Sequence, residues 1–105
     1  MPLSREFRET FQVRAARDPA FRKALLAEGV ECLLAGDLQA ARLLLRDYVN
    51  ATIGFEKLGE MAGKSPKSLM RMLGPRGNPR ASNLLGLLSV LQEHEGVHFD
   101  VRVVG

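Results

Sequence analysis

The chain is poor in the residues that mark disulfide-linked, metal-binding and membrane proteins. Its 105 residues include one cysteine, one tyrosine and no tryptophan. A single thiol, Cys32, excludes an intrachain disulfide and a zinc site built from thiolates, so we expect it to be a small buried apolar residue. No apolar run approaches the roughly 20 residues that span a bilayer, and the polar, charged N-terminal segment does not resemble a secretory signal. The sequence therefore predicts a cytoplasmic, single-domain protein over residues 1–105.

Acidic residues are missing from one stretch of the chain, although the net charge is only +3. Between Lys64 and Arg80 there is no aspartate or glutamate, and acidic residues resume only at Glu93. The stretch carries five cations, Lys64, Lys67, Arg71, Arg76 and Arg80. A run of positively charged residues without any acidic residue is typical of a surface that binds phosphates. The alternative is a solvated cationic loop and helix face with no ligand.

The spacing of apolar residues is helical over most of the chain and predicts an all-α fold. Asp18 before Pro19, and Asp37 after Gly36, are typical of helix starts, because an aspartate caps free amides and proline is tolerated at the first helical position. The helices are expected at about 4–16, 19–35, 38–51, 55–62, 66–73 and 81–95.

Two of these helices are short and separated by a glycine, in the segment from Gly54 to Leu73. Gly63 permits a tight turn, and Ser65 can cap the second helix with Pro66 at its first position. A basic second helix after such a turn is the layout of a helix-turn-helix, whose second helix enters the DNA major groove. The alternative is a helical hairpin that only contributes to a bundle.

The C-terminal tail alternates strictly from Val97 to Val103 and predicts a half-buried β-strand over residues 97–104. One face carries Val97, Phe99, Val101 and Val103. A single strand leaves its backbone groups unpaired, and no second strand is evident. We therefore expect these residues to pair with their twin in a homodimer; the alternative is addition to the sheet of a different protein.

Catalytic and metal-binding patterns are weak. His94 and His98 are four residues apart near acidic side chains, but Gly96 breaks the helix that would align them. Ser82 and Ser89 lack the surroundings of a nucleophile elbow or an oxyanion loop. The sequence thus predicts no metal, no cofactor and no enzymatic activity.

From Thr52 to Asp100 the chain resembles the lambda-repressor-like, Xre-type helix-turn-helix family, and within it the addiction-module antidote proteins, the antitoxins of bacterial toxin–antitoxin pairs. The residues that carry the resemblance are Gly54-Phe55-Glu56-Lys57-Leu58, Gly63, Lys67-Ser68-Leu69-Met70-Arg71-Met72-Leu73 and Gly77-Asn78-Pro79 before a leucine-rich helix. Two positions depart from the pattern. Gly59 replaces the usual alanine, at a cost of up to about 1 kcal/mol of helix propensity. Lys64 replaces a buried apolar residue, so either its stem runs along the core or the turn is displaced.

The resemblance implies a helix-turn-helix core over residues 54–96. The helical pattern before it predicts an N-terminal helical extension over 1–53. The resemblance also implies a homodimer that binds double-stranded operator DNA and represses its own operon, often with a toxin protein as a second partner. On the family pattern Lys67, Ser68 and Arg71 face the bases. We expect the surrounding polar residues to contact phosphates, namely Lys64, Ser65, Arg76, Asn78 and Arg80. Two alternatives stay open: an orphan transcription regulator without a toxin, and a protein-interaction module that does not bind DNA.

Overall fold

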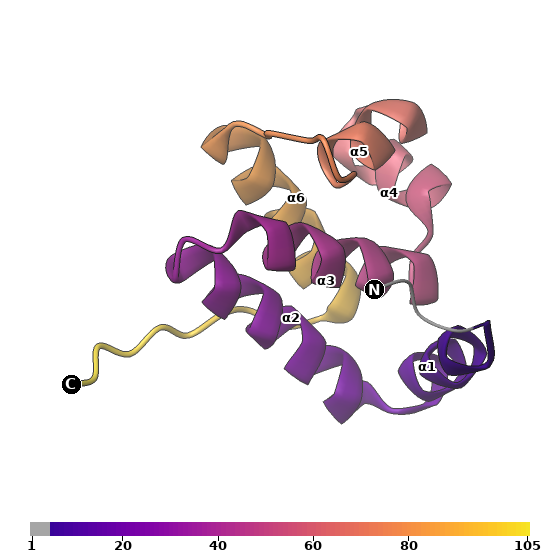
Figure 1. The fold of residues 1–105 in the computed structure, drawn as a ribbon, viewed down its shortest axis with the longest axis horizontal. Helices are drawn as coiled ribbons and strands as arrows, with labels where there is room; N and C mark the ends of the chain where they lie inside the picture. The colour runs from indigo at the N-terminus through magenta and orange to yellow at the C-terminus, as the bar shows by residue number, and fades with distance from the viewer. Residues whose placement is uncertain (1–4) are drawn as a thin grey trace.

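The computed structural model describes residues 5–105, apart from the side chains of Arg5 and Arg8, and these residues are all-helical. The helices are α1 (Arg5–Arg17), α2 (Pro19–Leu34), α3 (Leu38–Ala51), α4 (Phe55–Ala62), α5 (Pro66–Met72) and α6 (Ala81–Glu95) (Figure 1). The predicted all-α class is confirmed, and each predicted helix is present with bounds shifted by at most one residue within this range. Residues 1–4, which include the predicted start of the first helix, lie outside the described residues.

Side-chain caps start three of the helices, as the sequence predicts. The Asp18 carboxylate accepts the Phe21 N–H at 3.2 Å, and that of Asp37 accepts the Ala40 N–H at 3.1 Å. Ser65 caps α5 in the same way. Each cap satisfies an amide that the helix itself cannot pair, so these boundaries are fixed by local sequence.

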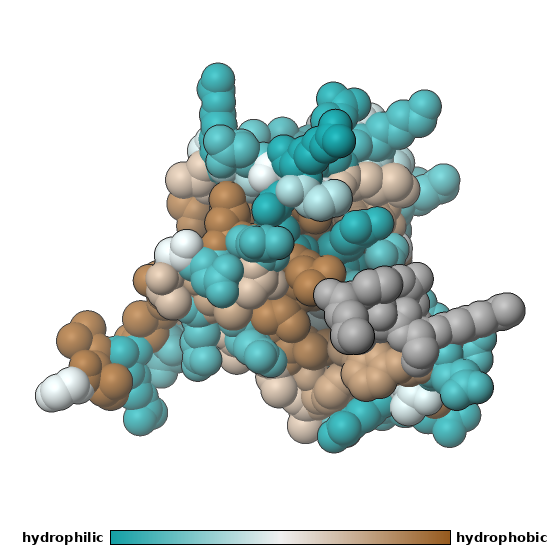
Figure 2. Space-filling view, in the orientation of Figure 1, coloured by the Kyte–Doolittle hydropathy of each residue, from teal (hydrophilic) through white to brown (hydrophobic). Residues whose placement is uncertain are grey.

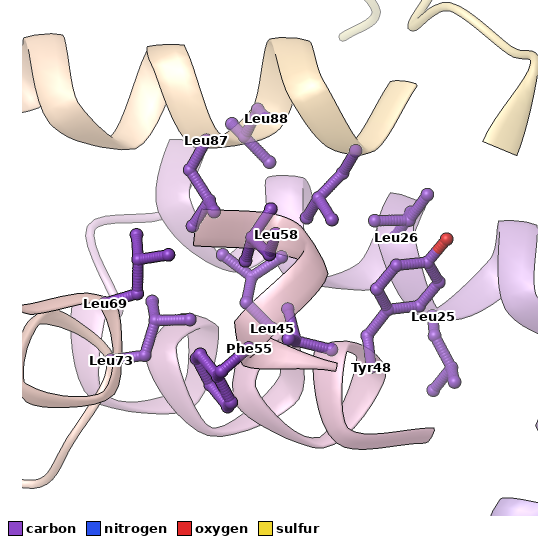
Figure 3. Close-up of a cluster of buried hydrophobic side chains, with 12 residues drawn as sticks. Leu25, Leu26, Leu45, Tyr48, Phe55, Leu58, Leu69, Leu73, Leu87 and Leu88 are labelled. Atoms are coloured by element: carbon purple, nitrogen blue, oxygen red, sulfur yellow. The ribbon is translucent and has the colours of Figure 1, made fainter. Parts of the chain in front are cut away.

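One hydrophobic core joins five of the helices. α2 and α3 pack against each other as a hairpin, and α6 crosses behind α3 in this view and packs against α4 (Figure 1). α4 and α5 lie together at one end of the molecule. Figure 3 shows the side chains that converge between them. The buried cluster consists of Leu25, Leu26, Leu45, Tyr48, Val49, Phe55, Leu58, Leu69, Leu73, Leu87, Leu88 and Leu91. The helices before residue 54 therefore share their core with those after it.

A half-buried ionic cluster ties the end of α6 to α2 and α3. Glu95 accepts hydrogen bonds from Arg22 Nε at 2.9 and 3.1 Å and from the Tyr48 hydroxyl at 2.6 Å. Burial alone would raise the pKa of Glu95, but the hydrogen bonds from Arg22 and Tyr48 and the charge of Arg22 outweigh burial and lower it. Burial and the Glu95 carboxylate raise the pKa of Tyr48. The cluster therefore fixes the C-terminal end of α6 against α2 and α3.

The predicted C-terminal strand over 97–104 is not seen. Residues 97–105 form no strand among the described residues, because the rest of that chain is helix and loop and offers no edge to pair with. Of its predicted inward face, Val97 and Phe99 are half-buried, whereas Val101 is 68% exposed and Val103 fully exposed. Phe99 still packs against the core, and the end of the tail extends away from the body of the molecule (Figure 1).

Candidate nucleic-acid interface

α4 and α5 are joined by a turn that depends on glycine. Gly63 ends α4 with φ of 67°, in the left-handed region that favours glycine, and the Lys64 N–H donates to the Gly59 carbonyl at 3.0 Å. Three residues then separate α4 from α5. The chain reverses in a short space, and α5 packs against α4 at the end of the molecule (Figure 1).

Gly59 in the middle of α4 is needed for this close approach. A Cβ built on Gly59 would lie 2.6 Å from the Lys64 carbonyl oxygen, closer than real side chains come to a backbone oxygen. The residue itself is buried. The departure from alanine, which costs helix propensity, thus allows the turn to fold back onto α4.

α5 presents one apolar face and one polar face. Leu69 and Leu73 are 1% and 2% exposed and belong to the core. The predicted base-facing residues Lys67, Ser68 and Arg71 are all exposed. Helical spacing predicted this division, since residues three and four apart share a face. α5 therefore holds its position through leucines and leaves its polar side chains accessible.

Every residue predicted to contact phosphates is also exposed, and so is each cation of the block from Lys64 to Arg80. Within residues 5–105, none of these five cations forms an ion pair with a carboxylate. Figure 2 shows hydrophilic side chains projecting from the end of the molecule that α4 and α5 form. The surface is cationic and unneutralised, which favours an anionic ligand. The nearest acids along the chain, Glu56 and Glu60, lie on α4 and are exposed.

The side chains of Ser65 and Ser68 are hydrogen-bonded to each other. The Ser65 hydroxyl oxygen accepts the Ser68 N–H at 3.1 Å and donates its own proton to the Ser68 hydroxyl at 2.9 Å. The Ser65 hydroxyl thus already donates its proton and accepts an N–H within the cap. It has no second proton to donate to a phosphate, which disfavours the phosphate contact predicted for it. The Ser68 hydroxyl proton remains free to donate outward. Ser68 is therefore suited to meet an acceptor, such as a base carbonyl, a purine N7 or a phosphate oxygen.

A buried arginine that the sequence did not single out supports the loop after α5. Arg42 of α3 is 9% exposed, and its Nη1 donates to the Gly74 carbonyl. Its Nε is buried without a hydrogen-bond partner in the part of the chain described. The positive charge lies near the C-terminal end of α5, where the helix dipole favours a cation. Arg42 thus fixes the start of the 74–80 loop, which carries Arg76, Asn78 and Arg80.

The loop folds tightly because of a second glycine with no room for a side chain. A Cβ on Gly77 would lie 2.2 Å from the Met72 carbonyl oxygen, and the Gly77 N–H donates to the Gly74 carbonyl at 2.9 Å. Arg76 is consequently held next to the end of α5. The loop and the helix form one surface.

Lys64 lies at the edge of a small cavity between the turn and α6. The cavity has a volume of about 150 Å³, and Leu69 and Leu87 also line it. Lys64 itself is exposed. This placement fits the first of the two explanations for a lysine at this position, in which the stem follows apolar surface and the ammonium reaches water.

The remaining candidates from the sequence are dispersed. Gly96 ends α6 with φ of 71°, so His94 lies on the helix and His98 in the tail. Among the described residues, no group of three histidine, cysteine, aspartate or glutamate side chains is placed to hold a metal ion.

Cys32 is half-buried, and its burial raises the pKa of its thiol. Within the described part of the chain, every helix is too short or too polar to cross a membrane.

Comparisons with protein-family models, with curated proteins and with solved structures found no match to this chain.

Proposed function

We propose that the chain is a sequence-specific DNA-binding transcription regulator in which α4 and α5 form a helix-turn-helix. The observation that carries the proposal is the unneutralised cationic surface around α5. Lys67, Ser68 and Arg71 point outward from a helix that leucines fix in the core, and cations flank it on both sides. Double-stranded DNA is the ligand that combines an anionic backbone with a groove wide enough for a helix.

The side chains divide into two roles in this proposal. Arg71 reads a base edge; an arginine that donates two hydrogen bonds to guanine contributes about 1–3 kcal/mol of discrimination. Lys67 and Ser68 supply further donors toward bases. Lys64, Arg76 and Arg80 hold phosphates, which fixes the register of α5 in the groove but reads no sequence. Asn78 adds a neutral phosphate contact.

Two arginine variants and a matched control test this division. Arg71→Ala should relax the preference at one base pair of a preferred duplex. Arg80→Ala should weaken binding to all duplexes about equally and reduce the slope of log affinity against log salt by about one per bound protomer. Lys23→Ala removes one exposed charge from α2, away from α5, and should change neither quantity. The proposal fails if both arginine variants bind every duplex as the unsubstituted protein does.

The finer proposal is that the protein is the antitoxin of a toxin–antitoxin pair and represses its own operon. This part rests on the resemblance of residues 52–100 to antidote proteins. The helices that precede this region offer apolar side chains that a partner could cover. α1, α2 and α3 expose large apolar side chains, with Val13 at 52%, Leu34 at 72% and Leu43 at 58% exposure. A toxin partner would cover apolar surface of this kind.

The genome offers a direct check of that finer proposal. A neighbouring gene for a small basic protein that co-purifies with this chain would support the antitoxin role. Specific operator binding with no such neighbour would instead support an orphan regulator. A chain that binds no duplex in a salt-dependent manner would be a protein-interaction module, and the DNA-binding proposal would be abandoned.

A further inference from the structure

As far as Phe99, one edge of the C-terminal tail is engaged by its own chain and the other is free. The Val97 N–H donates to the Gln92 carbonyl at 3.0 Å, and the Phe99 N–H donates to the Gln92 side-chain oxygen at 2.9 Å. Both odd-numbered residues therefore direct their amides toward α6 of their own chain. In an extended chain, successive residues point their N–H and C=O groups to opposite edges. The outer edge thus belongs to residues 98, 100, 102 and 104.

We propose that this outer edge pairs with the same edge of a second copy, as two antiparallel strands centred on Val101. In this register Asp100 of one chain lies opposite Arg102 of the other, twice by symmetry. These are the hydrogen-bonded positions, because residues 100 and 102 present their backbone groups outward. Val101 meets its own twin at the closer, non-hydrogen-bonded position, where Cα atoms are about 4.5 Å apart.

Charge selects this register over its neighbours. Moving the centre to residue 100 places the two Asp100 carboxylates opposite each other. Moving it to residue 102 places the two Arg102 side chains opposite each other. Like charges directly across a pair of strands are unfavourable, whereas opposite charges stabilise the pair. Sliding one strand along the other by a single residue would instead place polar side chains opposite apolar ones, because side chains alternate between the two faces.

The pairing also explains the exposed valines. Val103 is fully exposed in the single chain, and Phe99 packs against the core. In the centred register Val103 lies opposite Phe99 of the second copy, at the margin of that copy's core. The tail, at the lower left of Figure 2, carries hydrophobic surface away from the rest of the molecule. Their burial would offset the cost of ordering the tail.

The pairing gives the contact surface of the homodimer that the family resemblance implies, and in that respect it rests on the proposed function, yet it can be tested without DNA. Sedimentation equilibrium on the full chain over a range of concentrations measures the dimer dissociation constant. We expect Asp100→Arg and Arg102→Asp each to weaken the dimer roughly tenfold or more, because each replaces two attractive pairs by two repulsive ones. The two changes shift net charge in opposite directions, so net charge cannot explain a common effect.

The double variant, Asp100→Arg with Arg102→Asp, decides the register. It restores opposite charges in the centred register and should recover an affinity close to that of the unsubstituted chain. Raised salt should narrow the differences between the variants. A monomer at all concentrations, single variants that dimerise normally, or a double variant as weak as the worse single variant would each overturn the proposal. These outcomes leave DNA binding by α5 to its own test.

Discussion

Replacing Gly59 with alanine should destabilise the protein, although alanine is the better helix former. Glycine costs up to about 1 kcal/mol relative to alanine inside a helix, so propensity alone predicts a gain of that size. The structure predicts the opposite sign, because the new Cβ would lie 2.6 Å from the Lys64 carbonyl oxygen. That oxygen belongs to the backbone of the turn and cannot rotate away.

The size of the effect follows from these two opposing contributions. Forcing an extra methyl group into a packed site costs about 1–3 kcal/mol. After the gain in helix propensity is subtracted, we expect a net loss of up to about 2 kcal/mol in the free energy of unfolding. Since the turn must shift to relieve the contact, α5 should also move, and affinity for DNA should fall with it.

Gly86 provides a matched control in the middle of another helix. A Cβ on Gly86 of α6 would meet no atom within 4 Å. Gly86→Ala should therefore raise the free energy of unfolding by about 0.5–1 kcal/mol. Urea denaturation followed by circular dichroism gives both values. If Gly59→Ala stabilised the protein as much as Gly86→Ala does, the reasoning about the close turn would be refuted.

Three further changes test other contacts. Because its pKa is lowered, charged Glu95 contributes stability that is complete above the pKa of an unfolded glutamate and is lost as the pH falls through the lower folded value. Urea midpoints should thus show a large loss for Glu95→Gln near pH 7 that shrinks at acid pH; a constant loss would contradict this. Arg42→Ala removes the charged hydrogen bond to the Gly74 carbonyl, which keeps only the bond from the Gly77 N–H, and should cost about 1.5–3 kcal/mol. Amide exchange over residues 74–80 should become faster; unchanged exchange would show that Arg42 does not support the loop. Ser65→Ala removes the cap of α5 and should cost about 1 kcal/mol of stability by thermal melting, whereas an unchanged melting temperature would show that the cap is dispensable.

The helices could be predicted because their signals are local. An aspartate or serine cap acts on an amide three residues away, and the glycines that end α4 and α6 act within one turn. The outward position of Arg71 follows from helical spacing to Leu69 and Leu73 in the same way. These features depend on neighbours in the sequence, so the sequence was enough to place them.

The supporting contacts could not be predicted, because they join residues far apart in the chain. Arg22 and Glu95 are 73 positions apart, and Arg42 and Gly74 are 32 apart. Nothing in the residues around them marks these pairs before the helices are packed. The need for Gly59 is hidden for the same reason, since only the folded turn brings the Lys64 carbonyl onto it.

The tail shows a different limit of sequence reasoning. Alternation predicts a strand over residues 97–104, and the alternation holds as far as Asp100, with Phe99 half-buried and Asp100 exposed. A strand also requires an edge to pair with, and the described chain supplies none. The pattern of side chains therefore describes which face the tail can bury, while the strand itself would depend on a partner.

Binding of the purified protein to the DNA upstream of its own coding sequence tests the central claim most directly. The comparison duplex has the same length and composition in scrambled order, and both are titrated at several salt concentrations. We expect tighter binding to the upstream DNA, with affinity for both duplexes falling steeply as salt rises. Weak binding without salt dependence to either duplex would contradict a DNA-binding role for α5 and the cations around it.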